Sequence, residues 1–234
     1  MPSKKKTKKT SSHLKNRPAH VRQLTHQAFL PLVVLILVIW FIYRSLFQFP
    51  VWFDEIIGKA VFFGLPVWLY ITITGFRPII DSVRLDKLKP GLLRGIAFGG
   101  IFGFLTLFLR LLQNNGAFEL APLYLMNEFW WQLLLALLTA FWETIFFFSF
   151  IMIVVQDLFA DWSQLKQVVL VALIFLLFHI PNTFLRFNMT QTLPVLFLMA
   201  LFAIGQSYLF SQKNNAFTLI MTHTIWGMCL LIYF

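Results

Sequence analysis

Residues 129–159 read FWWQLLLALLTAFWETIFFFSFIMIVVQDLF, and this apolar run decides the fold. It is too long and too apolar for a helix of a soluble protein, so it predicts a membrane span. One carboxylate, Glu143, stands near the middle of the run. An ionisable side chain at that depth costs about 2.5 to 3.5 kcal/mol on insertion scales, and such residues normally face a protein interior or a wet cavity. Glu143 is therefore either a functional group or a protonated acid hydrogen-bonded to a neighbouring helix.

The composition of the whole chain is typical of a protein that crosses a membrane several times. Of its 234 residues, 59% are hydrophobic and only 12% are charged. Such a composition leaves no room for a sizeable soluble domain. We expect an all-α transmembrane bundle with about seven spans in the cell membrane. The apolar runs place these spans at Phe29–Phe47, Ile56–Gly75, Leu92–Leu112, Phe129–Phe159, Leu165–Ile180 (ended by Pro181-Asn182), Leu193–Phe210 and Ala216–Phe234.

The charge pattern predicts how the bundle is oriented. The segment from Met1 to His26 carries eight lysines and arginines and no acid, and we expect it to be a disordered tail. Lysine and arginine are also frequent in every second connection and scarce in the others, which places the N-terminus in the cytoplasm and the C-terminus outside. The net charge of +10 therefore indicates topology and contact with membrane lipid rather than nucleic-acid binding. The single cysteine, Cys229, excludes a disulfide within the chain.

Three ionisable side chains fall inside predicted spans and have no obvious salt-bridge partner: Glu143, His179 and His223. Lys59 also falls in a span, but its long stem allows it to reach an interface. If the three groups meet inside the bundle, a carboxylate general base would stand beside two imidazoles that can polarise a substrate carbonyl. The same set is the His₂Glu ligand set of catalytic zinc. No other cofactor is expected, and zinc stays open.

Three short motifs resemble the CAAX protease and bacteriocin-processing family of membrane proteins, also called the ABI or CPBP family. The family carries Glu-Glu-x-x-x-Arg on one helix, Phe-x-x-x-His on the next and His-x-x-x-Asn on the last. Here the first motif reads ETIFFF from Glu143, the second FLLFH up to His179, and the third HTIWG from His223. The resemblance covers roughly residues 90–234. It divides the chain into the tail at 1–26, N-terminal helices with a cytoplasmic loop at 27–89, and a CPBP-like core at 90–234.

The chain departs from the family at three motif positions. Thr144 replaces the second glutamate, Phe148 replaces the arginine, and Gly227 replaces the asparagine. The resemblance implies that Glu143 activates water and that His179 and His223 stabilise the oxyanion. Loss of one oxyanion donor typically lowers the rate by about 10² to 10³, so the departures allow either an altered peptidase or an inactive one.

The sequence therefore supports two functions of different classes. The first is an intramembrane endopeptidase that cleaves a membrane-embedded or lipidated peptide at Glu143, His179 and His223. The second is a catalytically impaired membrane scaffold or bacteriocin-immunity protein. Whether the three side chains face one water-reachable cavity, or are plugged by Phe148 and Trp226, distinguishes the two. A transporter is a weaker alternative, because the acidic path and paired broken helices of that class are not evident.

Overall fold

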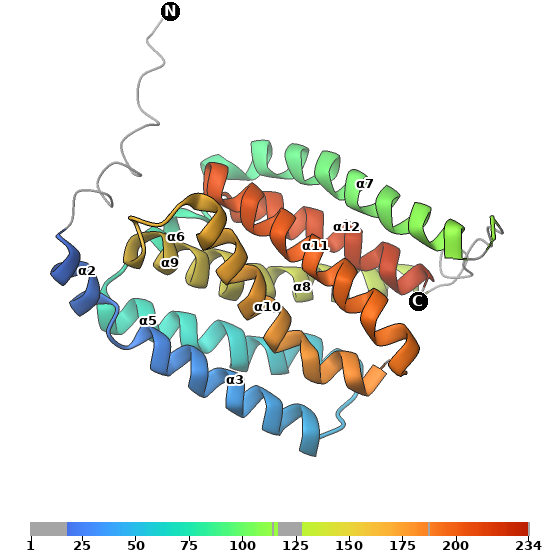
Figure 1. Cartoon of the computed structure of the whole chain (residues 1–234), viewed down its shortest axis with the longest axis horizontal. Helices are drawn as coiled ribbons and strands as arrows, with labels where there is room; N and C mark the ends of the chain where they lie inside the picture. Colours follow the sequence, from blue (N-terminus) through green and yellow to red (C-terminus); the bar gives the residue numbers. More distant parts are fainter. Residues whose placement is uncertain (1–17, 114, 117–127, 187, 234) are drawn as a thin grey trace, which may run out of the picture.

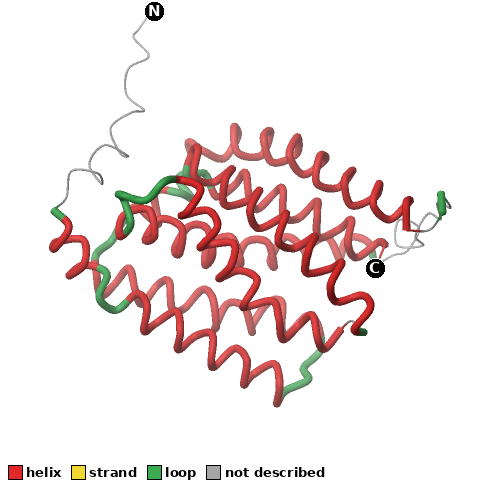
Figure 2. The backbone as a smooth tube through the Cα atoms, viewed as in Figure 1, coloured by secondary structure: helices red, strands yellow, loops and turns green. Residues whose placement is uncertain are grey.

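A computed structural model of the chain describes residues 18–113, 115–116, 128–186 and 188–233, and these residues contain helices and no strand. The helices lie side by side in one bundle (Figure 1), and Figure 2 shows only short connections between them in the described part. In chain order the α-helices are α2 (Ala19–Thr25), α3 (Phe29–Leu46), α4 (Val51–Phe53), α5 (Leu65–Thr74), α6 (Pro78–Asp81), α7 (Leu88–Gln113), α8 (Phe129–Glu143), α9 (Ile153–Leu158), α10 (Gln164–Arg186), α11 (Met189–Lys213) and α12 (Ala216–Tyr233). Segments of π-helix are η1 (Asp54–Gly58), η2 (Ala60–Gly64) and η5 (Thr144–Met152), and a 3₁₀ turn is η3 (Leu85–Lys87).

Among the described residues, six continuous helices are long and apolar enough to cross a membrane. They are His20–Leu46, Val51–Thr74, Pro78–Leu109, Phe129–Leu158, Gln164–Leu185 and Thr192–Lys213. The last helix, α12, is apolar over Ala216–Cys229 and completes the set. The expected all-α transmembrane bundle with about seven spans is therefore confirmed.

The helix that carries Glu143 lies at the centre of the bundle. In Phe129–Leu158, 72% of the most apolar stretch is buried, whereas the other five long helices bury 39% or less of theirs. The α8, η5 and α9 segments contact α10, α12, α5 and η2, so other helices surround this one. This burial explains why the run is apolar on all sides rather than along one stripe.

Glycines allow α7 and α12 to pack at close range. Four glycines of α7 stand at every fourth position and face α12: Gly91, Gly95, Gly99 and Gly103. A Cβ on Gly95 would lie 2.5 Å from the Cβ of Met221, and one on Gly99 would lie 2.7 Å from Cδ1 of Ile225. Small residues at this spacing let two transmembrane backbones approach closely. The helix that carries His223 is therefore held tightly against α7.

Helical structure begins nearer to the N-terminus than the sequence predicted. Residues 1–17 lie outside the described part, but Ala19–Thr25 form α2 rather than a disordered tail. His26 is buried, and its Nε2 lies 2.8 Å from Oδ2 of Asp157, while its Nδ1 is hydrogen-bonded to the Tyr70 hydroxyl. Buried polar partners on α9 and α5 thus fix the start of the first long helix, which composition alone did not reveal.

Pro181 does not end its helix, although the sequence predicted a stop there, because α10 continues to Arg186. A proline within a helix lacks an N–H and its ring disturbs the hydrogen bonds one turn earlier. Two side chains hydrogen-bond the carbonyls of that turn. The Trp40 indole N–H donates to the Phe178 carbonyl at 2.9 Å, and the Thr183 hydroxyl donates to the His179 carbonyl at 2.9 Å. Such partners are what permits proline inside a membrane helix.

Candidate active site

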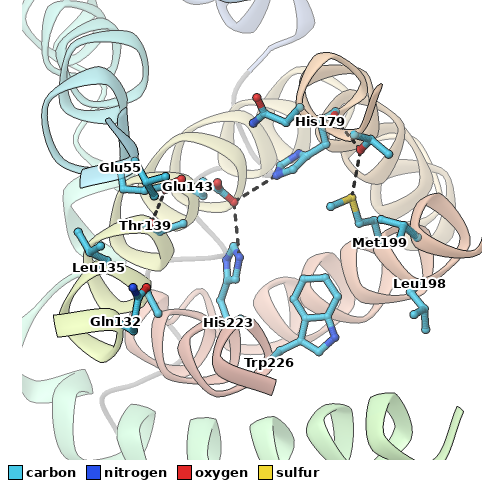
Figure 3. Close-up of a pocket in the computed structure, with 16 residues that line it drawn as sticks. Glu55, Gln132, Leu135, Thr139, Glu143, His179, Leu198, Met199, His223 and Trp226 are labelled. Atoms are coloured by element: carbon cyan, nitrogen blue, oxygen red, sulfur yellow. Dashed lines mark hydrogen bonds and ion pairs between the residues drawn. The ribbon is translucent and has the colours of Figure 1, made fainter. Parts of the chain in front are cut away.

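The three side chains singled out in the sequence meet inside the bundle. Nε2 of His179 lies 3.4 Å from Oε2 of Glu143, and Nε2 of His223 lies 3.5 Å from the same oxygen. Figure 3 shows the two imidazoles reaching Glu143 from different helices, α10 and α12. The carboxylate is almost entirely buried, with its side chain 4% exposed. One oxygen of Glu143 therefore faces both rings.

The other oxygen of Glu143 has a partner that the sequence analysis missed. The Lys59 ammonium lies 2.6 Å from Oε1 of Glu143 and 2.5 Å from Oε2 of Glu55. Lys59 is itself buried and does not reach an interface, so the expectation that Glu143 has no salt-bridge partner is wrong. Burying three charges is favourable only when they are paired closely, and here one cation joins two carboxylates.

Local helix geometry orients this ion set. The η1 and η2 segments of π-helix flank Lys59, and η5 begins directly after Glu143. Such wide turns are rare and frequently occur at functional sites. Glu55 is also held from the opposite side, because the Thr139 hydroxyl donates a hydrogen bond of 2.5 Å to Oε2 of Glu55. Glu55, Lys59, Thr139 and Glu143 thus connect α8 to the Val51–Thr74 helix.

The Nδ1 atoms of His179 and His223 have different surroundings. Nδ1 of His179 lies 2.8 Å from the Phe175 carbonyl oxygen, which only accepts, so this nitrogen carries a proton. Its Nε2 then donates to Glu143 only when the ring is an imidazolium. Nδ1 of His223 is buried and has no hydrogen-bond partner among the described residues. Both Nε2 atoms face the carboxylate and the cavity beside it.

A cavity of about 400 Å³ opens next to these groups. Its walls are largely apolar, with a few polar side chains that point into it (Figure 3). The residues that line it are Val51, Glu55, Gln132, Leu135, Ala136, Thr139, Glu143, His179, Asn182, Thr183, Val195, Leu198, Met199, His223, Trp226 and Gly227. A mainly apolar pocket with a few convergent polar groups is the usual form of a ligand site.

Neither of the two aromatic residues considered as plugs blocks the site. Phe148 is fully buried on η5 and stacks with Phe175 at 6.0 Å between ring centroids, and it does not line the cavity. Trp226 forms part of the wall, where it stacks on Phe202 and donates a hydrogen bond of 3.1 Å to the Thr106 hydroxyl. Glu143 and both histidines consequently line the cavity.

Comparison with known proteins supports the resemblance seen in the motifs. Residues 125–229 match the family model described as type II CAAX prenyl endopeptidase, Rce1-like. This region of the chain is Rce1-like. The match includes Glu143, His179 and His223. No curated protein and no solved structure was found to match the chain.

The charges missing from the first motif of the Rce1-like region come from outside it. Thr144 and Phe148 stand where a glutamate and an arginine are usual, yet Glu55 and Lys59 place a second acid and a cation beside Glu143. Both residues precede the matched range 125–229. The only sequence signal for them was the pair of opposite charges four residues apart in an apolar run.

In the third motif of the Rce1-like region, Gly227 leaves empty space where the family carries an asparagine side chain. A Cβ added to Gly227 would meet no atom within 4 Å, and Gly227 lines the cavity one helical turn beyond His223. Asn182 also lines the cavity, one turn beyond His179, and its Oδ1 is buried without a hydrogen-bond partner among the described residues. An amide side chain is thus present at the site, on a different helix from the one that the motif specifies.

The ion set does not fit the zinc alternative. Among the described residues, no group of three or more His, Cys, Asp or Glu side chains is arranged to hold a metal ion. The Lys59 ammonium contacts Glu143 directly, so a divalent cation on that carboxylate would lie beside a like charge. We therefore derive no chemical step through a metal.

Proposed function

We propose that the protein is an intramembrane endopeptidase in which Glu143 activates water and His179 and His223 stabilise the oxyanion. The observation that carries this proposal is the convergence of Glu143 and both histidines on one cavity. A carboxylate oxygen between two imidazoles, in a largely apolar cavity, combines a base with groups that can hydrogen-bond a carbonyl. The likeness to CAAX-type endopeptidases agrees with this chemistry at the level of the family.

The proposed reaction uses no group beyond the side chains and water. Oε2 of Glu143 accepts a proton from water as the water oxygen attacks the carbon of the scissile carbonyl. The electron pair of the carbonyl double bond moves to its oxygen, which is stabilised by the Nε2–H of His223 and by the Nε2–H that His179 carries as an imidazolium. When the tetrahedral intermediate collapses, the C–N bond breaks and the proton on Glu143 passes to the leaving amine.

Lys59 gives Glu143 its counter-charge and its orientation in this mechanism. Because the ammonium binds Oε1 at 2.6 Å, the second oxygen is directed at the rings and the cavity. Glu55 contacts the same ammonium and so balances its charge. The pairing keeps a carboxylate available in a site from which most water is excluded.

The cavity favours a peptide that already lies in the membrane. Leu135, Val195, Leu198 and Met199 form apolar wall, and the protein itself is a multi-pass membrane protein. We propose a membrane-embedded or lipidated peptide as substrate and the cell membrane as the location. Membrane lipid is then the second partner, and no nucleic-acid partner is proposed.

Cleavage assays with purified protein test the proposed function. Wild-type protein in lipid vesicles should cleave at least one member of a panel of fluorogenic peptides, either transmembrane or lipidated. Glu143→Gln should lower kcat by about 10² to 10⁴, the typical contribution of a general base. Glu128→Gln is the matched control, because Glu128 is exposed at the start of the same helix. Equal activity of wild type and Glu143→Gln, including none in either, would favour the scaffold or immunity protein.

Restoring the asparagine of the third motif should raise activity. Gly227→Asn places an amide in open space beside His223, and one oxyanion donor is typically worth about 10² to 10³ in rate. Because Asn182 already offers an amide to the cavity, we expect a smaller gain in kcat, on the order of tenfold. Gly227→Leu is the control, since it fills a similar volume without a donor. A gain with leucine equal to that with asparagine would show that filling the cavity, not the donor, is responsible.

A further inference from the structure

On every helix that lines the cavity, the lining residues extend from the level of Glu143, His179 and His223 toward the same end of the bundle. On α8 the lining residues run from Glu143 back to Gln132, towards the start of the helix. On α10 and α12 they run onward from each histidine towards the helix end, and on α11 they cluster near its start. Figure 1 shows that these helix ends lie at the same end of the bundle, opposite α2 and α6. The catalytic groups therefore form the floor of the cavity, and its mouth faces that end.

The side below this floor is closed by aromatic rings. Five phenylalanines there are at most 1% exposed: Phe146, Phe147, Phe148, Phe175 and Phe178. Phe147 contacts Phe146, Phe175 and Phe178 with ring centroids 5.0 to 5.3 Å apart, and Phe175 stacks on His179 at 4.0 Å. Interiors packed at this density leave no passage for a peptide. A substrate therefore cannot approach the site from the closed end.

Lysines and arginines gather at the closed end of the bundle. Among the described residues, the basic side chains of that end are Arg22, Arg77, Arg84, Lys87, Lys89, Arg94, Lys166 and Lys213. The mouth end holds fewer: Arg110, Arg186 and Arg44, which is paired with Asp54, while the connection before α8 contains Glu119 and Glu128 but no lysine or arginine. Because lysine- and arginine-rich connections stay in the cytoplasm, the mouth faces the opposite side of the membrane.

We propose that the site takes peptides from the non-cytoplasmic side of the membrane, as segments anchored in the outer leaflet. This inference rests on the proposed peptidase function for its chemistry, but the direction of the mouth stands on geometry and charge alone. A prenylated C-terminal peptide presented in the cytoplasm would meet the closed end.

Exposed aromatic side chains place the mouth at the membrane–water interface. Trp52 and Trp130 are 47% and 74% exposed, and Trp131 and Phe49 are 45% and 42% exposed. Trp52 follows Val51, which lines the mouth, Phe49 stands in the connection before it, and Trp130 and Trp131 lie at the start of α8 at the same end of the bundle. Exposed tryptophan marks the depth of the lipid headgroups. The mouth thus opens at the interface, where a lipid-anchored or membrane-embedded peptide exposes its chain.

Cysteine labelling in intact cells tests the direction of the mouth. In a Cys229→Ser background, single cysteines are placed in the cavity at Gln132, at its rim at Val51, and at the closed end at Lys166, and a membrane-impermeant maleimide is added outside. We expect labelling of Val51→Cys and Gln132→Cys in intact cells, and of Lys166→Cys only after the cells are opened. Labelling of Val51→Cys or Gln132→Cys only in opened cells, or in neither state, would overturn the inference, as would labelling of Lys166→Cys from outside.

A second arm tests the side from which substrate is taken. A fluorogenic peptide with an N-terminal myristoyl chain is added outside intact cells, and a prenylated C-terminal peptide is expressed inside them. We expect cleavage of the external peptide, abolished by Glu143→Gln, and no cleavage of the internal one. Cleavage of only the internal peptide overturns the inference while leaving the peptidase function intact. Correct labelling without cleavage of either peptide supports the mouth direction and counts against the peptidase function.

Discussion

Replacing Lys59 by methionine is expected to lower the free energy of unfolding by about 3 to 5 kcal/mol, the usual cost of removing one member of a buried ion pair. Methionine fills a similar volume but leaves Glu55 and Glu143 without the ammonium that now lies 2.5 and 2.6 Å from their oxygens. Two buried carboxylates would then share one site without a counter-charge. Thermal or denaturant unfolding in detergent measures the loss.

Two further variants separate the charge from the packing in this prediction. Lys59→Arg keeps the cation and should recover a large part of the stability, whereas Lys166→Met removes an exposed lysine and should change little. Combining Lys59→Met with Glu55→Gln removes one of the stranded charges and should be more stable than Lys59→Met alone. If Lys59→Met unfolds at the wild-type temperature, the ion set does not hold the two helices together.

Removing both histidines is expected to cost little more activity than removing one. Each histidine donates to the oxyanion in the proposed mechanism, so His179→Ala and His223→Ala should each lower kcat by about 10² to 10³. Residues that act as one unit are strongly non-additive. The double variant should therefore fall well short of the 10⁴ to 10⁶ loss that independent effects would give.

Single-turnover cleavage by the three variants, each checked for its unfolding temperature, measures this coupling. His20→Ala combined with His223→Ala is the matched control, because His20 is exposed on α2 and far from the site in the chain. That pair should show the loss of His223→Ala alone. Losses that multiply for His179 and His223 would mean that the two rings act in separate steps.

The helices were predictable because the membrane imposes one strong rule on them. Apolar runs about twenty residues long must become helices, so α3, α8 to α9 and α12 begin within a residue of the expected positions. The misplaced end of α10 came from Pro181, whose effect depends on Trp40 and Thr183. Those hydrogen bonds link residues whose proximity cannot be inferred from hydropathy.

The site was predictable only in part, because its charges come from distant segments. Glu143, His179 and His223 lie in recognisable motifs, and they meet as expected. Lys59 and Glu55 stand more than 80 residues before Glu143, and a lysine near a helix end usually extends to the interface. Only the fold shows that Lys59 instead points inward and binds Glu143.

The close fit of α7 against α12 also limits how the protein can move. Where Gly95 and Gly99 lie against Met221 and Ile225, sliding or turning α12 would bring other α7 side chains into contacts that only glycine allows. His223 therefore keeps its height in the membrane while substrate enters. We expect any widening of the cavity to come instead from the ends of α8 and α11 that line its mouth. Motions of helix ends on the microsecond-to-millisecond scale can then set the turnover rate without displacing the His223 imidazole.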